Sequence, residues 1–246
     1  EMTNRIQKVV GGDSTELMVG NVHRFCSKFL FEQDKIPADS AIIDDEEAVS
    51  IIADYRNEDE EGVTRDFNRY KGYQTIIFFQ HFIYQMEHQH PWKFYLHPES
   101  FTDDDREAIK QICKSQKREY NEQAVIDIYH HAQQYMDEAN VPGLDAKTAD
   151  RIRVLLWKMY YAVCYAQYKE ENHLLDFEDL LLKTYDIYST DDTCKRYKWI
   201  QVDEVQDLNG MQLAIIDLLT AKDNPMVMYL GDEQQAIFSF MGAKVE

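Results

Sequence analysis

Residues 199–212 read WIQVDEVQDLNGMQ and give the clearest indication of the fold. Its first four residues are mostly apolar, as in a β-strand, and two adjacent acids, Asp203 and Glu204, end the run. Burying a charge is costly unless the charge is paired, hydrogen-bonded or bound to a metal. The stretch therefore indicates either a strand that has reached solvent or a site that holds a metal ion and a water molecule.

A second apolar run, PMVMYLGD at 225–232, reads as a strand of the kind that is buried on both faces of a parallel sheet. The segment at 209–221 has the spacing of an amphipathic helix. In open parallel α/β sheets, ligands bind at the carboxyl ends of the strands, and both acidic stretches stand there. The ends of the chain are therefore expected to form an α/β fold.

The acids after the first strand fit the needs of phosphoryl transfer, which requires Mg²⁺ and a residue that positions the attacking water. Asp203 is the candidate for the metal, reached through water because Mg²⁺ dehydrates reluctantly. Glu204 is the candidate that orients or deprotonates the water. Gln235, beyond the second strand, is an amide that can bond a γ-phosphate oxygen.

Two aromatic residues, Phe238 and Phe240, follow in the same stretch. Aromatic side chains at a sheet edge can stack on the bases of single-stranded nucleic acid, at about 1–3 kcal/mol per base. Packing in a hydrophobic core is the alternative for both.

Composition restricts the class of protein. The chain has 246 residues, a net charge of −19 and few Gly and Pro, 9 and 5. The acidity argues against a general polyanion binder, because phosphate contact needs clustered Lys and Arg. No apolar run is long enough for a bilayer, no signal peptide is recognisable at the start, and the four cysteines form no CxxC pair. We expect a reduced, cytoplasmic protein that makes no membrane contact.

The middle of the chain, roughly 31–172, is expected to be nearly all helical and to form an insertion within the α/β part. One long helix is predicted from 145 to 171, and the pattern over 104–139 is also helical. Residues 16–25 read as a short strand that runs into a helix. The aromatic run TIIFFQHFIYQ at 75–85 is compatible with a strand or with a buried helix.

The stretch LLDFEDLL at 174–181 predicts a helix that opens at Asp176, with Asp179 as its capping partner and capping as the favoured sole role of both. His88, His90 and His97 lack the spacing and the companions of a zinc site, so we expect them on a surface loop. The basic segment 106–118 is expected to be a solvated helix face, with DNA backbone contact as the alternative.

Three of these stretches together, VDEVQDLNGMQ, LGDEQQAIFSFMGA and LLDFEDLL, resemble the UvrD/Rep-type superfamily 1 DNA helicases. That family writes them VDExQDxNxxQ, GDxxQxIYxFRGA and DFxDLL. The start of the chain also resembles the end of the family's A-A-x-E-M-x-x-R-I helix, and VGNVHRFC at 19–26 resembles its T-F-H-S-F-C stretch.

The resemblance implies an incomplete RecA-like P-loop NTPase sheet with a large helical 1B insertion. Residues 1–30 and 173–246 would belong to motor domain 1A, and residues 31–172 would be domain 1B. The activity implied is ATP-dependent 3′–5′ movement on single-stranded DNA with Mg²⁺. Asp203 would serve Mg²⁺, Glu204 would be the catalytic base and Gln235 would sense the γ-phosphate. The implied DNA contacts are Asn21, His23, Phe238 and Phe240.

The sequence departs from the family in ways that leave alternatives open. It contains no G-x-x-x-x-G-K-[ST] phosphate loop, and Gly11-Gly12 lacks the lysine of one. Met241 replaces the family's Arg, and Asn21 replaces its Thr. We therefore expect a fragment that is inactive by itself. The alternatives are the motor part of a recombination-repair helicase–nuclease and a degenerate, non-enzymatic interaction module.

Overall fold

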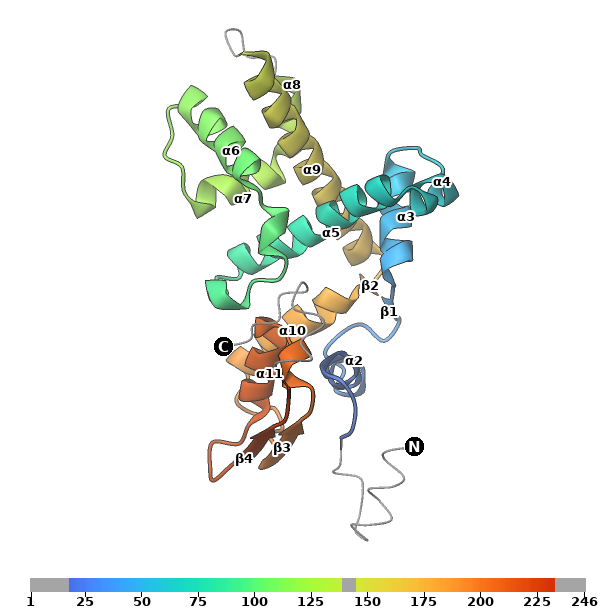
Figure 1. Ribbon diagram of the computed structural model, residues 1–246, viewed down its shortest axis with the longest axis vertical. Coiled ribbons are helices and arrows are strands. Elements are labelled where there is room, and N and C mark those ends of the chain that lie inside the picture. The colour runs from blue at the N-terminus through green and yellow to red at the C-terminus, as the bar shows by residue number, and fades with distance from the viewer. Residues whose placement is uncertain (1–17, 139–144, 233–246) are drawn as a thin grey trace.

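The computed structural model describes residues 18–138 and 145–232, which form two lobes joined by a short pair of strands (Figure 1). The helical lobe comprises residues 43–138 and 145–173, and the sheet lobe comprises residues 18–40 and 176–232. Each lobe has a cluster of buried hydrophobic side chains, and Leu96 of the helical lobe belongs to the cluster of the sheet lobe. Within the described ranges, no helix is both long and apolar enough to cross a bilayer.

Two long helices, α5 (Phe67–Glu87) and α9 (Ala146–Glu171), pack against each other at the centre of the helical lobe. The ambiguous run at 75–85 lies inside α5 and is helical. Its Phe79, Phe82 and Ile83 are fully buried, because several other elements cover this helix. A helix covered on many sides loses the 3.6-residue apolar period, which explains why periodicity alone left the run undecided.

Shorter elements surround this pair in the helical lobe: α3 (Asp45–Tyr55), α4 (Glu60–Arg65), η2 (Trp92–Phe94), η3 (Pro98–Ser100), α6 (Asp103–Ser115), α7 (Glu122–His130) and α8 (Ala132–Glu138). The helical pattern over 104–139 is thus three helices. Local hydrogen bonds explain the first break: Gln116 ends α6, Lys117 has a positive φ of 54°, and the Asn121 side chain accepts from Ala124 N at the start of α7.

The sheet lobe is built from α2 (Val22–Glu32), α10 (Phe177–Thr190), β3 (Trp199–Val202), η4 (Val205–Asp207), α11 (Gly210–Leu219) and β4 (Met226–Tyr229). α10 packs on both α2 and α11, and this contact forms the core of the lobe. β1 (Ala41–Ile42) and β2 (Leu174–Leu175) pair in parallel where the lobes meet. The predicted helices that open at Asp176 and Asn209 are confirmed.

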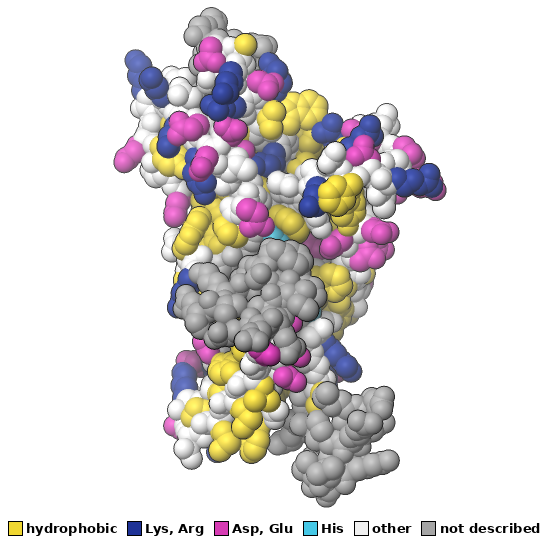
Figure 2. Space-filling model, viewed as in Figure 1, with side chains coloured by type: hydrophobic (Ala, Val, Ile, Leu, Met, Phe, Trp, Pro, Cys, Tyr) yellow, Lys and Arg dark blue, Asp and Glu magenta, His cyan; other side chains and the backbone are white. Residues whose placement is uncertain are grey.

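β3 and β4 run parallel, with Trp199 opposite Met226 and Val202 opposite Tyr229. Parallel pairing is as predicted, but burial of the second strand on both faces is wrong. Met226 and Met228 are 55% and 43% exposed. The sheet has two strands within the described residues, too few to bury both faces. Figure 2 shows hydrophobic side chains gathered at the lower end of the molecule, over β3 and β4.

The strand expected before the first described helix is also absent from residues 18–21, the part of that stretch that the structure describes. These residues lead directly into α2, whose first turn is capped by the Asn21 side chain. The start of the chain, which resembles the end of a family helix, lies outside the described residues.

Candidate functional site

The predicted catalytic acids lie where β3 ends, beside the end of β4. Val205 N donates to Leu230 O at 3.0 Å, and Leu230 N donates to Val202 O at 2.8 Å. These bonds extend the parallel pairing beyond the strands and hold the two chain segments together. Asp203 and Glu204 are both exposed at this edge, which confirms that the strand reaches solvent here.

The backbone of Glu204 adopts a left-handed conformation, with φ 52° and ψ 42°. A residue with a side chain enters this region rarely, and only when its surroundings hold it there. Here Glu204 N donates to Asp203 Oδ1 at 3.0 Å, and Asp207 N donates to Glu204 O at 2.9 Å. These two bonds hold the turn in which Glu204 takes this conformation.

Gln206 is the buried partner of this turn, with 6% of its surface exposed. Its Nε2 donates to Glu204 Oε2 at 2.5 Å, and its Oε1 accepts from Asp232 N at 3.1 Å. The side chain therefore joins the Glu204 carboxylate to the chain that follows β4. Sequence reasoning assigned no role to Gln206, although the residue stands two positions after the candidate base.

The Asp203 carboxylate suits a magnesium ion. One oxygen accepts from Glu204 N, and the other accepts no hydrogen bond from the described part of the chain. A single exposed carboxylate oxygen is a common protein ligand of Mg²⁺, which keeps most of its waters. The edge therefore offers one Asp203 oxygen for a hydrated cation. The adjacent Glu204 carboxylate is available to bind a water molecule.

Asn21 and His23 lie at the start of α2 on the sheet lobe. Asn21 Oδ1 accepts from Arg24 N at 2.8 Å, so this side chain caps the helix. His23 meets Phe177 edge to face, with ring centroids 5.9 Å apart. Burial lowers the pKa of His23, and the nearby Glu178 carboxylate only partly opposes that effect. His23 is therefore mainly neutral at pH 7, a hydrogen-bonding group rather than a cation.

Phe177 is a candidate for nucleic-acid contact that sequence reasoning missed. It is 41% exposed at the first position of α10, beside His23. An exposed ring next to a polar side chain is the kind of surface on which a base can stack. The signal in the sequence was an apolar residue directly after the helix cap, where solvent exposure is usual. Gln235, Phe238, Phe240 and Met241 lie outside the described residues.

A buried network of charged side chains joins the two lobes where α5 and α9 meet α10. Lys169 Nζ of α9 lies 2.7 Å from Asp176 Oδ2 and 2.6 Å from Asp179 Oδ2 of α10. His81 Nε2 of α5 lies 2.9 Å from Asp176, and Tyr165 OH donates to the same carboxylate at 2.7 Å. Asp176 and Asp179 do form a capping box, as predicted. Capping as their sole role is wrong, since both carboxylates also pair with Lys169.

The network has the electrostatics of a closed ion cluster. Burial opposes the charge on Asp176, but His81 and Lys169 lie so near that the pKa of this carboxyl falls well below its usual range. Burial likewise acts against the charged forms of His81 and Lys169, yet the Asp176 carboxylate outweighs it and raises the pKa of both. The pKa of Asp179 is raised, mainly by burial and also by repulsion from the Asp176 carboxylate.

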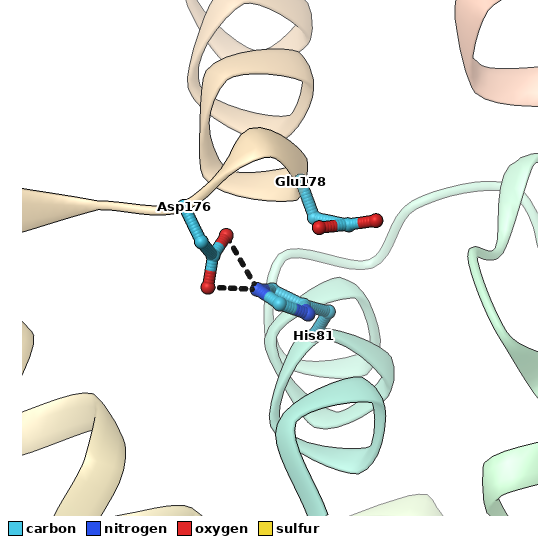
Figure 3. A group of neighbouring side chains, drawn as sticks. All are labelled: His81, Asp176 and Glu178. Carbon is cyan, nitrogen blue, oxygen red and sulfur yellow. Dashed lines mark hydrogen bonds and ion pairs between the residues drawn. The ribbon is translucent and has the colours of Figure 1, made fainter. Parts of the chain in front are cut away.

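His81, Asp176 and Glu178 place one ligand atom each within 4.8 Å of one another (Figure 3). Such a set is able to hold a divalent cation in principle. Here, however, the Lys169 ammonium already balances Asp176, and Glu178 Oε1 meets His97 Nε2 at 3.3 Å. The group is therefore satisfied by other side chains of the chain itself, and we assign it a structural role.

The expectation that His88, His90 and His97 occupy a surface loop is wrong for His90. His90 is buried, and its Nε2 lies 2.6 Å from Asp186 Oδ1 of α10. His97 is partly buried and stacks on Phe78 with centroids 3.6 Å apart. Both His90 and His97 contact α10 because the loop after α5 lies against that helix, a tertiary contact that local spacing does not reveal.

Comparison with known proteins gives a family match over the whole chain and matches to individual relatives over about a third of it. The family model described as the UvrD/REP helicase N-terminal domain matches residues 1–246. The chain is 36% identical over 95 residues to DNA helicase II of Escherichia coli strain K12, which covers 37% of this chain and 13% of that protein. It is 36% identical over 93 residues to the ATP-dependent DNA helicase Rep of Buchnera aphidicola, covering 35% and 13%.

A relative of a second type is also similar. An ATP-dependent helicase/nuclease subunit of Lactiplantibacillus plantarum is 33% identical over 90 residues, which covers 32% of this chain and 7% of that protein. The aligned stretches thus span about an eighth or less of the length of these relatives.

Proposed function

We propose that this chain, which belongs to the UvrD/Rep helicase family, supplies half of the ATP site of an ATP-dependent DNA helicase. We also propose that it supplies part of the surface that contacts single-stranded DNA, here called the DNA track. The observation that carries this proposal is the turn after β3. There Glu204 stands in a left-handed conformation beside Asp203, at the carboxyl end of a parallel strand. Two exposed, adjacent carboxylates at that position suit a metal-bound nucleotide and a water molecule.

In the proposed reaction, water attacks the γ-phosphorus of ATP, and Glu204 orients that water and accepts its proton. A new oxygen–phosphorus bond forms while the bond from γ-phosphorus to the β,γ-bridging oxygen breaks. That oxygen takes the electron pair, so ADP and phosphate leave. Asp203 would hold the hydrated Mg²⁺, which when bound supplies positive charge beside the phosphate oxygens. Gln235 would bond a γ-phosphate oxygen and respond to its loss.

The proposed DNA track begins at the start of α2. Asn21 and His23 would contact the backbone of single-stranded DNA, and Phe238 and Phe240 would stack on its bases. Phe177 extends this surface, since it is exposed beside His23. The proposal also includes movement in the 3′–5′ direction and a cytoplasmic location. Its fold would be a RecA-like 1A domain with a 1B insertion at 31–172.

The catalytic part is tested by Glu204→Gln in the longest available protein that carries this segment. The change keeps the size of the side chain but removes the proton acceptor, so DNA-stimulated ATPase activity should fall by about 10²–10⁴-fold. Glu119→Gln, an exposed acid of the helical lobe, is the matched control. ATPase activity that survives Glu204→Gln would refute the assigned base. The 246-residue chain alone should turn over little ATP, because its sequence contains no phosphate loop.

The DNA part is tested by Phe177→Ala in the same protein. Loss of one stacked base costs about 1–3 kcal/mol, a 5- to 150-fold weaker affinity for single-stranded DNA. Phe67→Ala removes an even more exposed ring from the helical lobe, 67% exposed, and should leave DNA affinity unchanged. Equal losses for the two variants would argue that the ring at Phe177 contacts no base.

A second candidate is the motor part of a helicase–nuclease, which the 33% identity to a helicase/nuclease relative favours. DNA cleavage by the longer protein, with an ATPase that depends on Glu204, would select it. A non-enzymatic module is the third candidate, motivated by Met241 and by the absence of a phosphate-loop sequence. Tight binding of ATP and Mg²⁺ by the longer protein would exclude that candidate.

A further inference from the structure

We propose that Gln206 is a positioning residue: it holds the Glu204 carboxylate in place and couples it to the chain that leaves β4. The inference rests on the proposed role of Glu204. It adds a residue through which the end of β4 and the candidate base act on each other. The bond from Gln206 Nε2 to Glu204 Oε2 and the bond from Asp232 N to Gln206 Oε1 carry it.

The orientation of the Gln206 amide is fixed by chemistry at both ends. A carboxylate has only acceptors, so the group that faces Glu204 must be the NH₂. The backbone N–H of Asp232 is a donor, so the group that faces it must be the amide oxygen. A flipped amide would set two acceptors against each other at 2.5 Å and two donors at 3.1 Å. The orientation that allows one bond therefore also allows the other, which makes the amide a two-ended link.

The space for this link exists because residue 231 is glycine. A Cβ on Gly231 would lie 2.4 Å from Gln206 Oε1 and 2.7 Å from Val205 Cγ1. It would also lie 3.3 Å from Val205 N, a backbone atom that pairs with Leu230 O. A methyl group there would push the amide away from both partners. Gly231 thus supports the same conclusion by a separate observation, close packing rather than hydrogen bonding.

The link has a direct effect on the proposed chemistry. Glu204 is exposed, and within the described residues its side chain bonds only to Gln206, through Oε2. An exposed glutamate without such a partner samples several rotamers. With Oε2 held, the rotamer is restricted and Oε1 is left to face a water molecule. Near-attack geometry is worth about 10²-fold in rate for an error of 1 Å, so holding this carboxylate matters for turnover and not for ATP affinity.

The other end of the link reaches the segment that precedes Gln235. Asp232 stands three positions before that residue, and its N–H is the donor to Gln206. A shift of the chain after β4, when the γ-phosphate is present or lost, would therefore move the amide and with it Glu204. Gln206 in this way connects the proposed sensor with the proposed base.

The test uses Gln206→Met in the longest available protein that carries this segment. Methionine has nearly the length of glutamine but lacks the amide. We expect the kcat of the DNA-stimulated ATPase to fall by about 10- to 100-fold, with KM for ATP and affinity for a non-hydrolysable ATP analogue unchanged. Gly231→Ala should give the same split. Gln123→Met, an exposed glutamine of α7, is the matched control and should keep full activity.

A double-mutant cycle with Glu204→Gln separates positioning from a merely structural role. If Gln206 acts through Glu204, Gln206→Met should have no further effect on the residual rate of Glu204→Gln. The inference is overturned if the two losses multiply, if kcat of Gln206→Met equals that of the parent, or if KM rises along with a drop in melting temperature. Full activity of Glu204→Gln alone would instead remove the proposed function, so the two failures are distinguishable.

Discussion

Removal of the Lys169 side-chain charge is the sharpest test of the junction between the two lobes. Lys169→Met keeps much of the aliphatic stem and deletes the ammonium, whose Nζ lies 2.7 Å from Asp176 and 2.6 Å from Asp179. The side chain of Lys169 is only 5% exposed, and those of Asp176 and Asp179 are 6% and 11% exposed. Water therefore cannot replace the lost cation without opening the contact between α9 and α10.

The expected loss follows from this burial. Breaking a buried ion pair by removing one partner costs about 3–5 kcal/mol, because the remaining charge is left uncompensated. For a chain of this size, that loss lowers the melting temperature by about 6–20 °C. An exposed pair gives the contrast. Lys110 contacts Glu107, and both side chains are about half exposed, so Lys110→Met should change the free energy of unfolding little.

The assay is urea unfolding of the 246-residue chain at pH 7, followed by circular dichroism. Adding Asp176→Asn and Asp179→Asn to Lys169→Met should recover most of the lost stability, since neutral side chains can still cap the helix and need no cation. If Lys169→Met loses no more stability than Lys110→Met, the buried ammonium contributes no more than an exposed one. That result would refute the reasoning that the cluster holds the lobes together.

Three further outcomes are expected. Because Asp176 outweighs burial and raises the pKa of His81, the stabilisation from His81 should be full below about pH 6.5 and lost as pH rises through the folded pKa. The urea midpoint should therefore be lower at pH 9 than at pH 6, and His81→Gln should remove the part of this difference that comes from His81. Arg56→Gln should cost about 1–2 kcal/mol by urea unfolding, because its guanidinium lies 5.4–5.5 Å from three aromatic rings. Burial raises the pKa of the Cys26 thiol to about 12, so a thiol reagent at pH 8 should label the partly exposed Cys194 and leave Cys26 unlabelled until the chain unfolds.

The sequence was sufficient where a local signal and a tertiary need agree. Asp145 precedes a long apolar-periodic segment and caps α9, and Asn209 caps α11 in the same way. The acids after β3 were found because a strand that ends in two carboxylates is unusual. For the same reason, Asp203 and Glu204 were placed at the correct edge of a parallel pair of strands.

The remaining features depend on contacts between distant segments. His81 and Asp176 are 95 positions apart, and neither residue signals the other. Phe177 and His23 meet only because α10 packs on α2. Gln206 carries no signal of its own in the sequence, since a glutamine near an acid is common. Its importance comes from the N–H of Asp232, a backbone group that no side-chain pattern reveals.

The pairing of β1 with β2 makes the helical lobe a replaceable module. Ala41 lies opposite Leu174 and Ile42 opposite Leu175, so the chain leaves and rejoins the sheet lobe one strand spacing apart, about 4.8 Å. Segments whose ends are adjacent tolerate insertion, exchange and loss, because the flanking elements do not have to move. Parallel strands cannot be joined by a tight turn, so the shortest substitute between Ile42 and Leu174 is a crossover of about a dozen residues. Evolution and protein engineering can therefore alter the helical lobe without rebuilding the sheet lobe.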